Sequence, residues 1–175
     1  TSVEAVRIAR SMRYGVNGNF VVDPDWTEGD FRALWDFVAL HGLQRAGYTI
    51  LTPLPGTELF QELAPRLQGN PWFRYDMHHV LWEPRLGAAR FFELYAETWR
   101  RSILNTSGEK PLSDWLRQVR AEQIPYLLRV LRRTQKMMDA GAYLEEHEAS
   151  RRARDSEAGR AAPLHWCARM VRRIP

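Results

Sequence analysis

Two short runs rich in β-branched and apolar residues, each ending at prolines, do most to restrict what this chain can fold into. Residues 16–24 read VNGNFVVDP and residues 46–54 read AGYTILTPL, and both patterns are typical of β-strands. Between them, apolar residues recur at helical spacing until Gly42. A helical crossover of this length joins parallel strands. The sequence therefore predicts an α/β fold with two parallel strands.

Capping signals mark the helices around these strands. Apolar residues at roughly helical spacing over 3–12 predict a first helix. Thr27 precedes Asp30 by three residues, an approximate capping box, and Trp26 before it is a candidate hydrophobic staple. Thr57 is the expected N-cap of a third helix. The predicted order is helix, strand, helix, strand, helix.

Two strands are too few for this kind of sheet, because parallel sheets are buried on both faces and need several members. Either further strands come from sequence that precedes Thr1, or the fold interpretation is wrong, and we favour the first. The opening TSVEAVRIARSM has the pattern of a helix interior, without an initiator Met or a signal peptide. The chain is expected to be a fragment cut at its front end.

The character of the sequence changes after residue 69. NPWFRYDMHHVLWEP is rich in aromatic residues and is expected to be extended or irregular, whereas LGAARFFELYAETWRRSILN predicts a strongly amphipathic helix. One or two more helices are expected, interrupted or begun around Pro125. The predicted division is an α/β part over 1–69, an aromatic-rich segment and α-helical extension over 70–147, and a basic, poorly ordered tail over 148–175.

Charge and cysteine content restrict partners and compartment. The net charge is +4 and the pI about 9.6, but much of the excess basic charge lies late in the chain, without aromatic residues interleaved on one basic face. Such a run is more typical of a solvated surface than of a nucleic-acid site. The single Cys167 excludes an internal disulfide and fits a reducing cytosol, so we expect a cytoplasmic protein. No apolar run is long enough for a transmembrane segment.

Each predicted strand ends in a rigid turn, DPDWT at 23–27 and TPLPGT at 52–57. In α/β folds, ligands bind at the carboxyl ends of parallel strands. Prolines there would hold the backbone still against a ligand. The other explanation is that both are simply tight turns between a strand and a helix. The spacing alone leaves both explanations open.

Three phrases in succession carry a family resemblance: NFVVDPDWTEGDF, YTILTPLPGTELF and YDMHHVLWEPRL. They resemble the C-terminal part of radical S-adenosylmethionine (SAM) enzymes, above all the group with an N-terminal cobalamin-binding domain that includes hopanoid C-3 methylases. TPLPGTELF is the most specific part, and the resemblance covers about residues 1–105. It implies the C-terminal part of a partial (β/α)6 radical SAM barrel, with the last two barrel strands present here, followed by an α-helical extension.

The resemblance also implies which residues contact SAM. The turn after the first strand reads DPD where the family commonly has glycine, and hopanoid-methylase-like members share that departure. Residues of the first strand would face the SAM pocket, partly through polar side chains, and residues of the second would contact adenine through backbone and apolar surface. The implied cofactor-binding residues are Asn19, Val21, Asp23, Ile50, Thr52 and Pro53.

The family's Cys-x3-Cys-x2-Cys motif for a [4Fe–4S] cluster is absent, and so is a glycine-rich segment for the amino-acid end of SAM. A solitary Cys167 cannot replace three thiolates. In the family these parts lie upstream, so the missing N-terminal part of the same polypeptide is an expected partner and this fragment alone is expected to be inactive. By resemblance, the parent uses SAM, the cluster and cobalamin to methylate an unactivated carbon of a small-molecule or lipid substrate such as a hopanoid.

The remaining candidates are His78 and His79, which adjoin Asp76. Neighbouring residues of an extended chain point to opposite faces, so no metal site is predicted. In the resembling proteins a D-x-x-H segment closes the barrel on the substrate side. His79 therefore either packs and hydrogen-bonds or contacts substrate. The alternative function is a non-enzymatic helical interaction module or a nucleic-acid-binding module, based on the helices of 86–147 and the basic tail.

Overall fold

The computed structural model describes residues 1–43, 45–67, 72–103 and 120–155. The Cys167 position and the tail beyond residue 155 therefore lie outside the described residues. None of the described helices is long and apolar enough to cross a membrane. The elements are α1 (Ser2–Ser11), β1 (Asn17–Val22), α2 (Glu28–Leu40), β2 (Arg45–Ile50), α3 (Glu58–Leu67), a 3-10 turn η1 (Trp72–Arg74), α4 (Ala88–Ile103), η2 (Ala121–Gln123), α6 (Ile124–Thr134), η3 (Gln135–Met138) and α7 (Ala140–Asp155).

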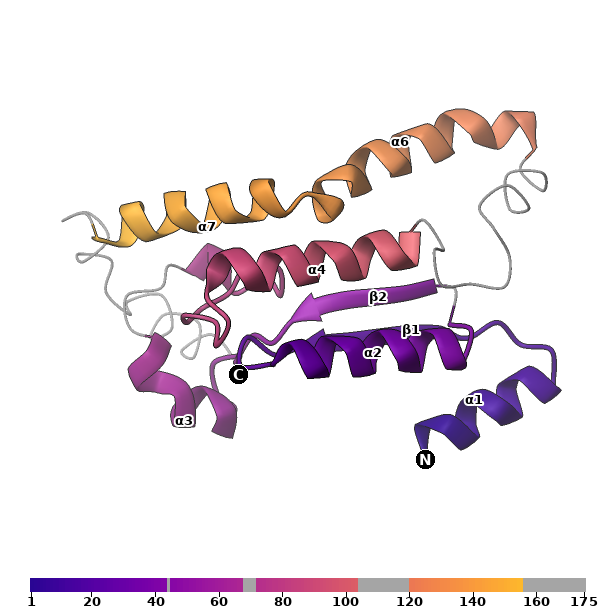
Figure 1. Cartoon of the computed structure of the whole chain (residues 1–175), viewed down its shortest axis with the longest axis horizontal. Helices are drawn as coiled ribbons and strands as arrows, with labels where there is room; N and C mark the ends of the chain where they lie inside the picture. The colour runs from indigo at the N-terminus through magenta and orange to yellow at the C-terminus, as the bar shows by residue number, and fades with distance from the viewer. Residues whose placement is uncertain (44, 68–71, 104–119, 156–175) are drawn as a thin grey trace, which may run out of the picture.

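The two predicted strands form a parallel pair joined by α2, which confirms the α/β prediction (Figure 1). The register runs from Asn17 opposite Arg45 to Val22 opposite Ile50. The sheet of the described residues has two strands, so the barrel stays a prediction.

Helices cover one face of this pair. Phe20 and Val22 of β1 and Tyr48 of β2 turn into a core shared with α2 and α4. Figure 1 shows α4 between the sheet and α7, so that the molecule is built in layers, whereas α1 lies at the edge. The amphipathic helix predicted over LGAARFFELYAETWRRSILN is α4, which buries Phe91, Phe92 and Tyr95 and half-buries Trp99.

The capping signals are confirmed. The Thr27 hydroxyl accepts from the Asp30 amide, and the Asp30 carboxylate accepts from the Thr27 amide at 2.7 Å. The Trp26 ring packs edge-on against Phe31 with centroids 5.5 Å apart, which is the geometry of a hydrophobic staple. At α3, the Thr57 hydroxyl accepts from the Phe60 amide at 3.2 Å. These local contacts set the point at which each helix leaves its strand.

The outer edge of β2 is closed by side chains rather than by another strand. The Tyr95 hydroxyl donates to the Tyr48 carbonyl at 3.0 Å, and the Ser102 hydroxyl donates to the Ala46 carbonyl at 3.1 Å. Further along the same edge, the Ile50 amide donates to the Met77 carbonyl at 2.7 Å. Exposed sheet edges invite pairing, and three outward main-chain groups of this edge have partners. In the described structure, β2 is therefore a terminal strand.

Helix α7 runs through the boundary predicted at residue 147 and ends at Asp155. Ser150, beyond that boundary, is buried. The division into 1–69, 70–147 and 148–175 stays a prediction. Pro125 stands in the first turn of α6, as expected for a helix that begins there.

Candidate functional site

The face of the strands opposite the helices is open and carries two of the predicted SAM contacts. Asn19 and Val21 lie on this face, opposite Gly47 and Thr49 of β2. Val21 is 52% exposed although it is a β-branched residue in a strand. A Cβ at Gly47 would meet the Asn19 side-chain oxygen at 2.8 Å, so the Asn19 amide lies directly over the glycine. This makes an open surface with an apolar side chain beside a polar one.

The free edge of β1 lies beside this face. In a parallel ladder, alternate residues point their N–H and C=O groups toward the partner strand. The Leu51 amide donates to the Val22 carbonyl at 2.9 Å, which places the even-numbered residues of β1 toward β2. The main-chain groups of Asn19 and Val21 consequently point away from β2, and no partner for them occurs among the described residues. One edge of the sheet is closed by α4 and the other is open.

The predicted residues on β2 are placed differently. The Ile50 side chain is 1% exposed and lies in the core on the helix-covered face. Its carbonyl accepts from the Thr52 hydroxyl at 3.1 Å, and Pro53 is buried. The structure therefore does not bring the side chains of Ile50 and Val21 together, and a contact from Ile50 to a ligand is restricted to its main chain.

Asp23 begins the tight turn after β1. Its carboxylate accepts from the Asp25 amide at 2.8 Å, and its carbonyl accepts from the Trp26 amide at 3.0 Å. Asx turns of this kind hold the main chain locally. The Asp23 side chain thus stabilises the turn at the end of β1, next to the open face.

Asp25 connects three segments at the carboxyl ends of the strands, and sequence reasoning assigned it no role. Arg66 of α3 donates to both of its carboxylate oxygens, at 2.7 and 2.9 Å, and the Trp82 indole donates at 3.1 Å. The Arg66 guanidinium also lies over the Trp82 ring, 5.1 Å from its centroid. The hydrogen bonds from Arg66 hold the pKa of Asp25 below its ordinary value, against the opposing effect of burial. No local signal pairs these residues, because they are far apart in sequence.

The D-x-x-H segment lies beside the end of β2, since the Met77 carbonyl accepts from the Ile50 amide. Asp76 accepts from the main-chain amides of His78 and His79, at 2.9 and 3.2 Å. Burial works to raise the pKa of Asp76, but the hydrogen bond to the His79 side chain and that from the His78 amide outweigh it and lower the pKa.

His79 is held between two carboxylates. Its Nδ1 lies 2.9 Å from Asp76 Oδ1, and its Nε2 lies 3.3 Å from Glu146 Oε1 on α7. The side chain is only 14% exposed. Both ring nitrogens thus have partners in the protein, which is the hydrogen-bonding explanation of this residue. A substrate contact for His79 stays a prediction.

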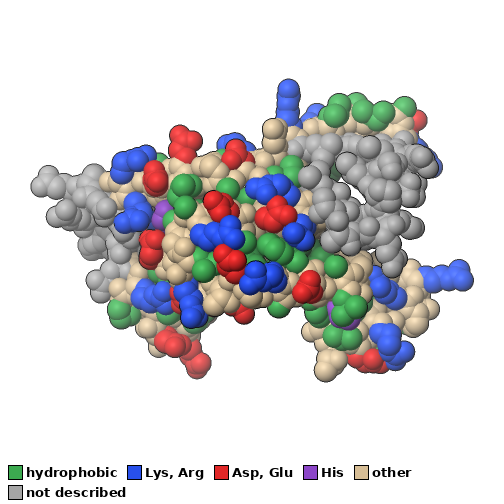
Figure 2. All heavy atoms as spheres, in the orientation of Figure 1, with side chains coloured by type: hydrophobic (Ala, Val, Ile, Leu, Met, Phe, Trp, Pro, Cys, Tyr) green, Lys and Arg blue, Asp and Glu red, His purple; other side chains and the backbone are tan. Residues whose placement is uncertain are grey.

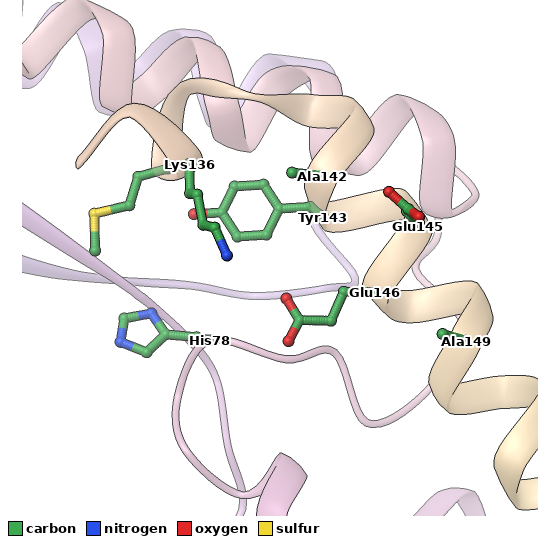
Figure 3. Close-up of a pocket in the computed structure, with 8 residues that line it drawn as sticks. His78, Lys136, Ala142, Tyr143, Glu145, Glu146 and Ala149 are labelled. Atoms are coloured by element: carbon green, nitrogen blue, oxygen red, sulfur yellow. The ribbon is translucent and has the colours of Figure 1, made fainter. Parts of the chain in front are cut away.

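An open hollow of about 620 Å³ lies next to this contact. In Figure 3 the hydroxyl end of Tyr143 points toward Lys136, while the ring of His78, below them, points away from the carboxylate of Glu146. Burial raises the pKa of Tyr143, so this hydroxyl stays protonated. The hollow presents both signs of charge, which is why the lining alone does not select one class of ligand.

A buried polar contact joins η1 to α7. Arg74 is 1% exposed and donates to the Val80 carbonyl. Its guanidinium also lies 3.2 Å from His147 Nδ1. An arginine has only donors, so His147 Nδ1 accepts this bond. The burial of His147 comes from the tertiary structure.

The described residues do not fit a metal centre. No group of three or more His, Cys, Asp or Glu side chains comes together to hold a metal ion in the part of the chain that the structure describes. An iron–sulfur cluster needs several thiolates, and the sequence has one cysteine. The residues present here thus supply no ligand set for the cluster.

Comparison with known proteins gives one informative similarity. Over 111 residues the chain is 31% identical to the bacteriochlorophyllide d C-12(1)-methyltransferase of Chlorobaculum tepidum, a match that covers 59% of this chain and 24% of that protein. The chain therefore spans about a quarter of the length of the relative it matches. No family model and no solved structure matches. The chain is similar to part of a methyltransferase.

Proposed function

We propose that this chain is the C-terminal part of a cobalamin-dependent radical SAM methyltransferase, in which the open face of β1 and β2 forms part of the SAM-binding wall. The observation that carries the proposal is a parallel strand pair with one closed edge and one open edge. The similarity to part of a methyltransferase adds support. In this arrangement β2 is the last strand of the sheet, and the strand before β1 pairs with Asn19 and Val21.

The open face suits one part of SAM. A flat, largely apolar ring system such as adenine can lie on the exposed Val21 side chain, while the Asn19 amide offers a donor and an acceptor beside it. Asp23, Thr52 and Pro53 border this surface at the strand ends. SAM supplies the methyl and adenosyl chemistry when it is bound. The residues of this chain orient it and keep water from one side.

The substrate is proposed to be lipid-like and polycyclic, such as a hopanoid, methylated at an unactivated carbon. The relative acts on bacteriochlorophyllide d, as its name states. The D-x-x-H segment is proposed to close the site on the substrate side, because it lies at the end of β2 and is fixed there by Asp76 and His79. No chemical step is assigned to the chain's own side chains.

Two measurements test the proposal. The coding sequence upstream of Thr1 in the natural polypeptide should contain the Cys-x3-Cys-x2-Cys motif, and its absence would remove the radical SAM assignment. In that natural polypeptide, Val21→Arg should weaken SAM binding about tenfold or more, because an apolar contact of about 1.5 kcal/mol is lost and the face is blocked. Equilibrium dialysis with labelled SAM measures this.

The matched control is Leu40→Arg, on the exposed side of α2, where the side chain is 79% exposed. This variant should bind SAM as the unaltered protein does. Equal affinity for the Val21 and Leu40 variants would contradict the placement of SAM on this face, while leaving the fold unaffected.

A further inference from the structure

Helix α6 presents an apolar face to solvent, unlike the other long helices of the C-terminal half. Ile124 and Leu128, one helical turn apart on this face, are 45% and 60% exposed. Figure 2 shows green side chains along the upper right of the molecule, where Figure 1 places α6. By contrast, α4 buries Phe91 and Tyr95.

Within the described structure, α6 packs mainly against the short turns η2 and η3 that flank it. Figure 1 shows it leading away from α4 and α7 toward one end of the molecule. Ile124 and Leu128 belong to neither core cluster of the described residues. The apolar face is thus available to something outside the described residues.

The flank of α6 next to this face is basic. Arg129 and Arg132 are exposed, and Lys136 follows at helical spacing just after the helix ends. At 100° per residue, Arg129 lies about 140° and Arg132 about 80° around the axis from Ile124, so the basic flank adjoins the apolar face. The segment 124–136, IPYLLRVLRRTQK, contains basic residues and no acidic residue. A one-sided positive charge beside an exposed apolar face is the pattern of helices that lie in a lipid interface.

We propose that α6 docks this chain onto an anionic lipid surface, with Ile124 and Leu128 entering the headgroup region and the arginines pairing with lipid phosphates. Charge complementarity favours this occupant, because a lipid surface supplies both negative charge and an apolar layer along the whole length of the helix. The helix lies on the surface and does not span it, in keeping with the lack of a described helix able to cross a membrane. The inference is independent of the proposed methyltransferase function.

Vesicle flotation of the full chain tests the proposal. The chain should float with vesicles of mixed phosphatidylcholine and phosphatidylglycerol, and should stay behind with phosphatidylcholine alone or at high salt. Leu128→Glu should abolish flotation. Removing the charges in Arg129→Gln/Arg132→Gln should lower partitioning about fivefold for each arginine.

The matched control is Ile8→Glu on α1, because Ile8 is 44% exposed and close to Ile124 in exposure. This variant should float like the unaltered chain. Three results would overturn the proposal: flotation that ignores the lipid charge, flotation that survives Leu128→Glu, or no flotation at all. If the chain forms a dimer without vesicles and Leu128→Glu dissociates it, the apolar face binds a second copy of the chain. If the chain shifts duplex DNA in a salt-sensitive way and does not float, the helix binds nucleic acid. Either would also overturn it.

Discussion

One of the contacts that close the edge of β2 comes from the phenol group of Tyr95, and Tyr95→Phe tests its contribution. Tyr95 is 0% exposed, and its hydroxyl donates to the Tyr48 carbonyl at 3.0 Å. The substitution keeps the ring, which stacks on Phe91 at 6.1 Å between centroids. It leaves a buried carbonyl without its donor, which costs about 1–3 kcal/mol. The expected loss of unfolding free energy is therefore about 2 kcal/mol, although no packed carbon atom is removed.

Urea and thermal unfolding of the chain measure this loss. A loss of about 2 kcal/mol corresponds to a fall in Tm of about 4–8 °C at this chain length. Hydrogen exchange in β2 should accelerate in the same variant. The control is Tyr126→Phe. Because Tyr126 is 69% exposed, removing its hydroxyl leaves no buried group without a hydrogen-bond partner. A Tyr95→Phe protein as stable as the unaltered chain, or an equal loss in both variants, would refute the view that α4 side chains close this edge.

Three further outcomes follow from the contacts. Thr27→Ala should lower the unfolding free energy by about 1 kcal/mol in urea, because it removes the capping hydroxyl, and Thr27→Ser should restore it; equal stability of both variants would contradict the capping role. Burial raises the pKa of Tyr95 to about 12, so its stabilising effect is complete below the unfolded pKa near 10 and is lost as the pH rises toward 12. In Tyr95→Phe the unfolding free energy should then fall less steeply as the pH rises. An identical dependence on pH in both proteins would contradict Tyr95 as the source of the alkaline loss. Arg66 lowers the pKa of Asp25 below 3.8, so stability should fall as the pH drops through and below that value; Asp25→Asn should flatten this acid limb in pH-dependent thermal unfolding, and an unchanged limb would exclude the pair as its source.

Local signals in the sequence predicted the elements and their order. Thr27, Asp30 and Trp26 lie within a few residues of one another, so their spacing in the sequence is enough to predict the capping and stapling contacts. The helical crossover likewise predicted that the two strands are parallel.

The sequence did not predict which strand residues face the open side of the sheet. The alternation of a strand puts neighbours on opposite faces, and the resemblance implied a contact from Val21 and, through backbone and apolar surface, one from Ile50. The structure turns Val21 outward and buries the side chain of Ile50, because α2 and α4 cover only the face of the sheet on which Ile50 lies. Long-range partners were also missed: the Asp25 contacts to Arg66 and Trp82 join residues that no local pattern relates.

By itself, the sequence determined where helices and strands begin and that the strands run in parallel, since these depend on neighbours along the chain. Only the tertiary structure decided which sheet face is open, which edge is closed, and that His147 is buried while Leu128 is exposed. Those properties depend on which distant segment covers each surface. Burial of a side chain is a property of its surroundings, and the surroundings exist only once the chain has folded.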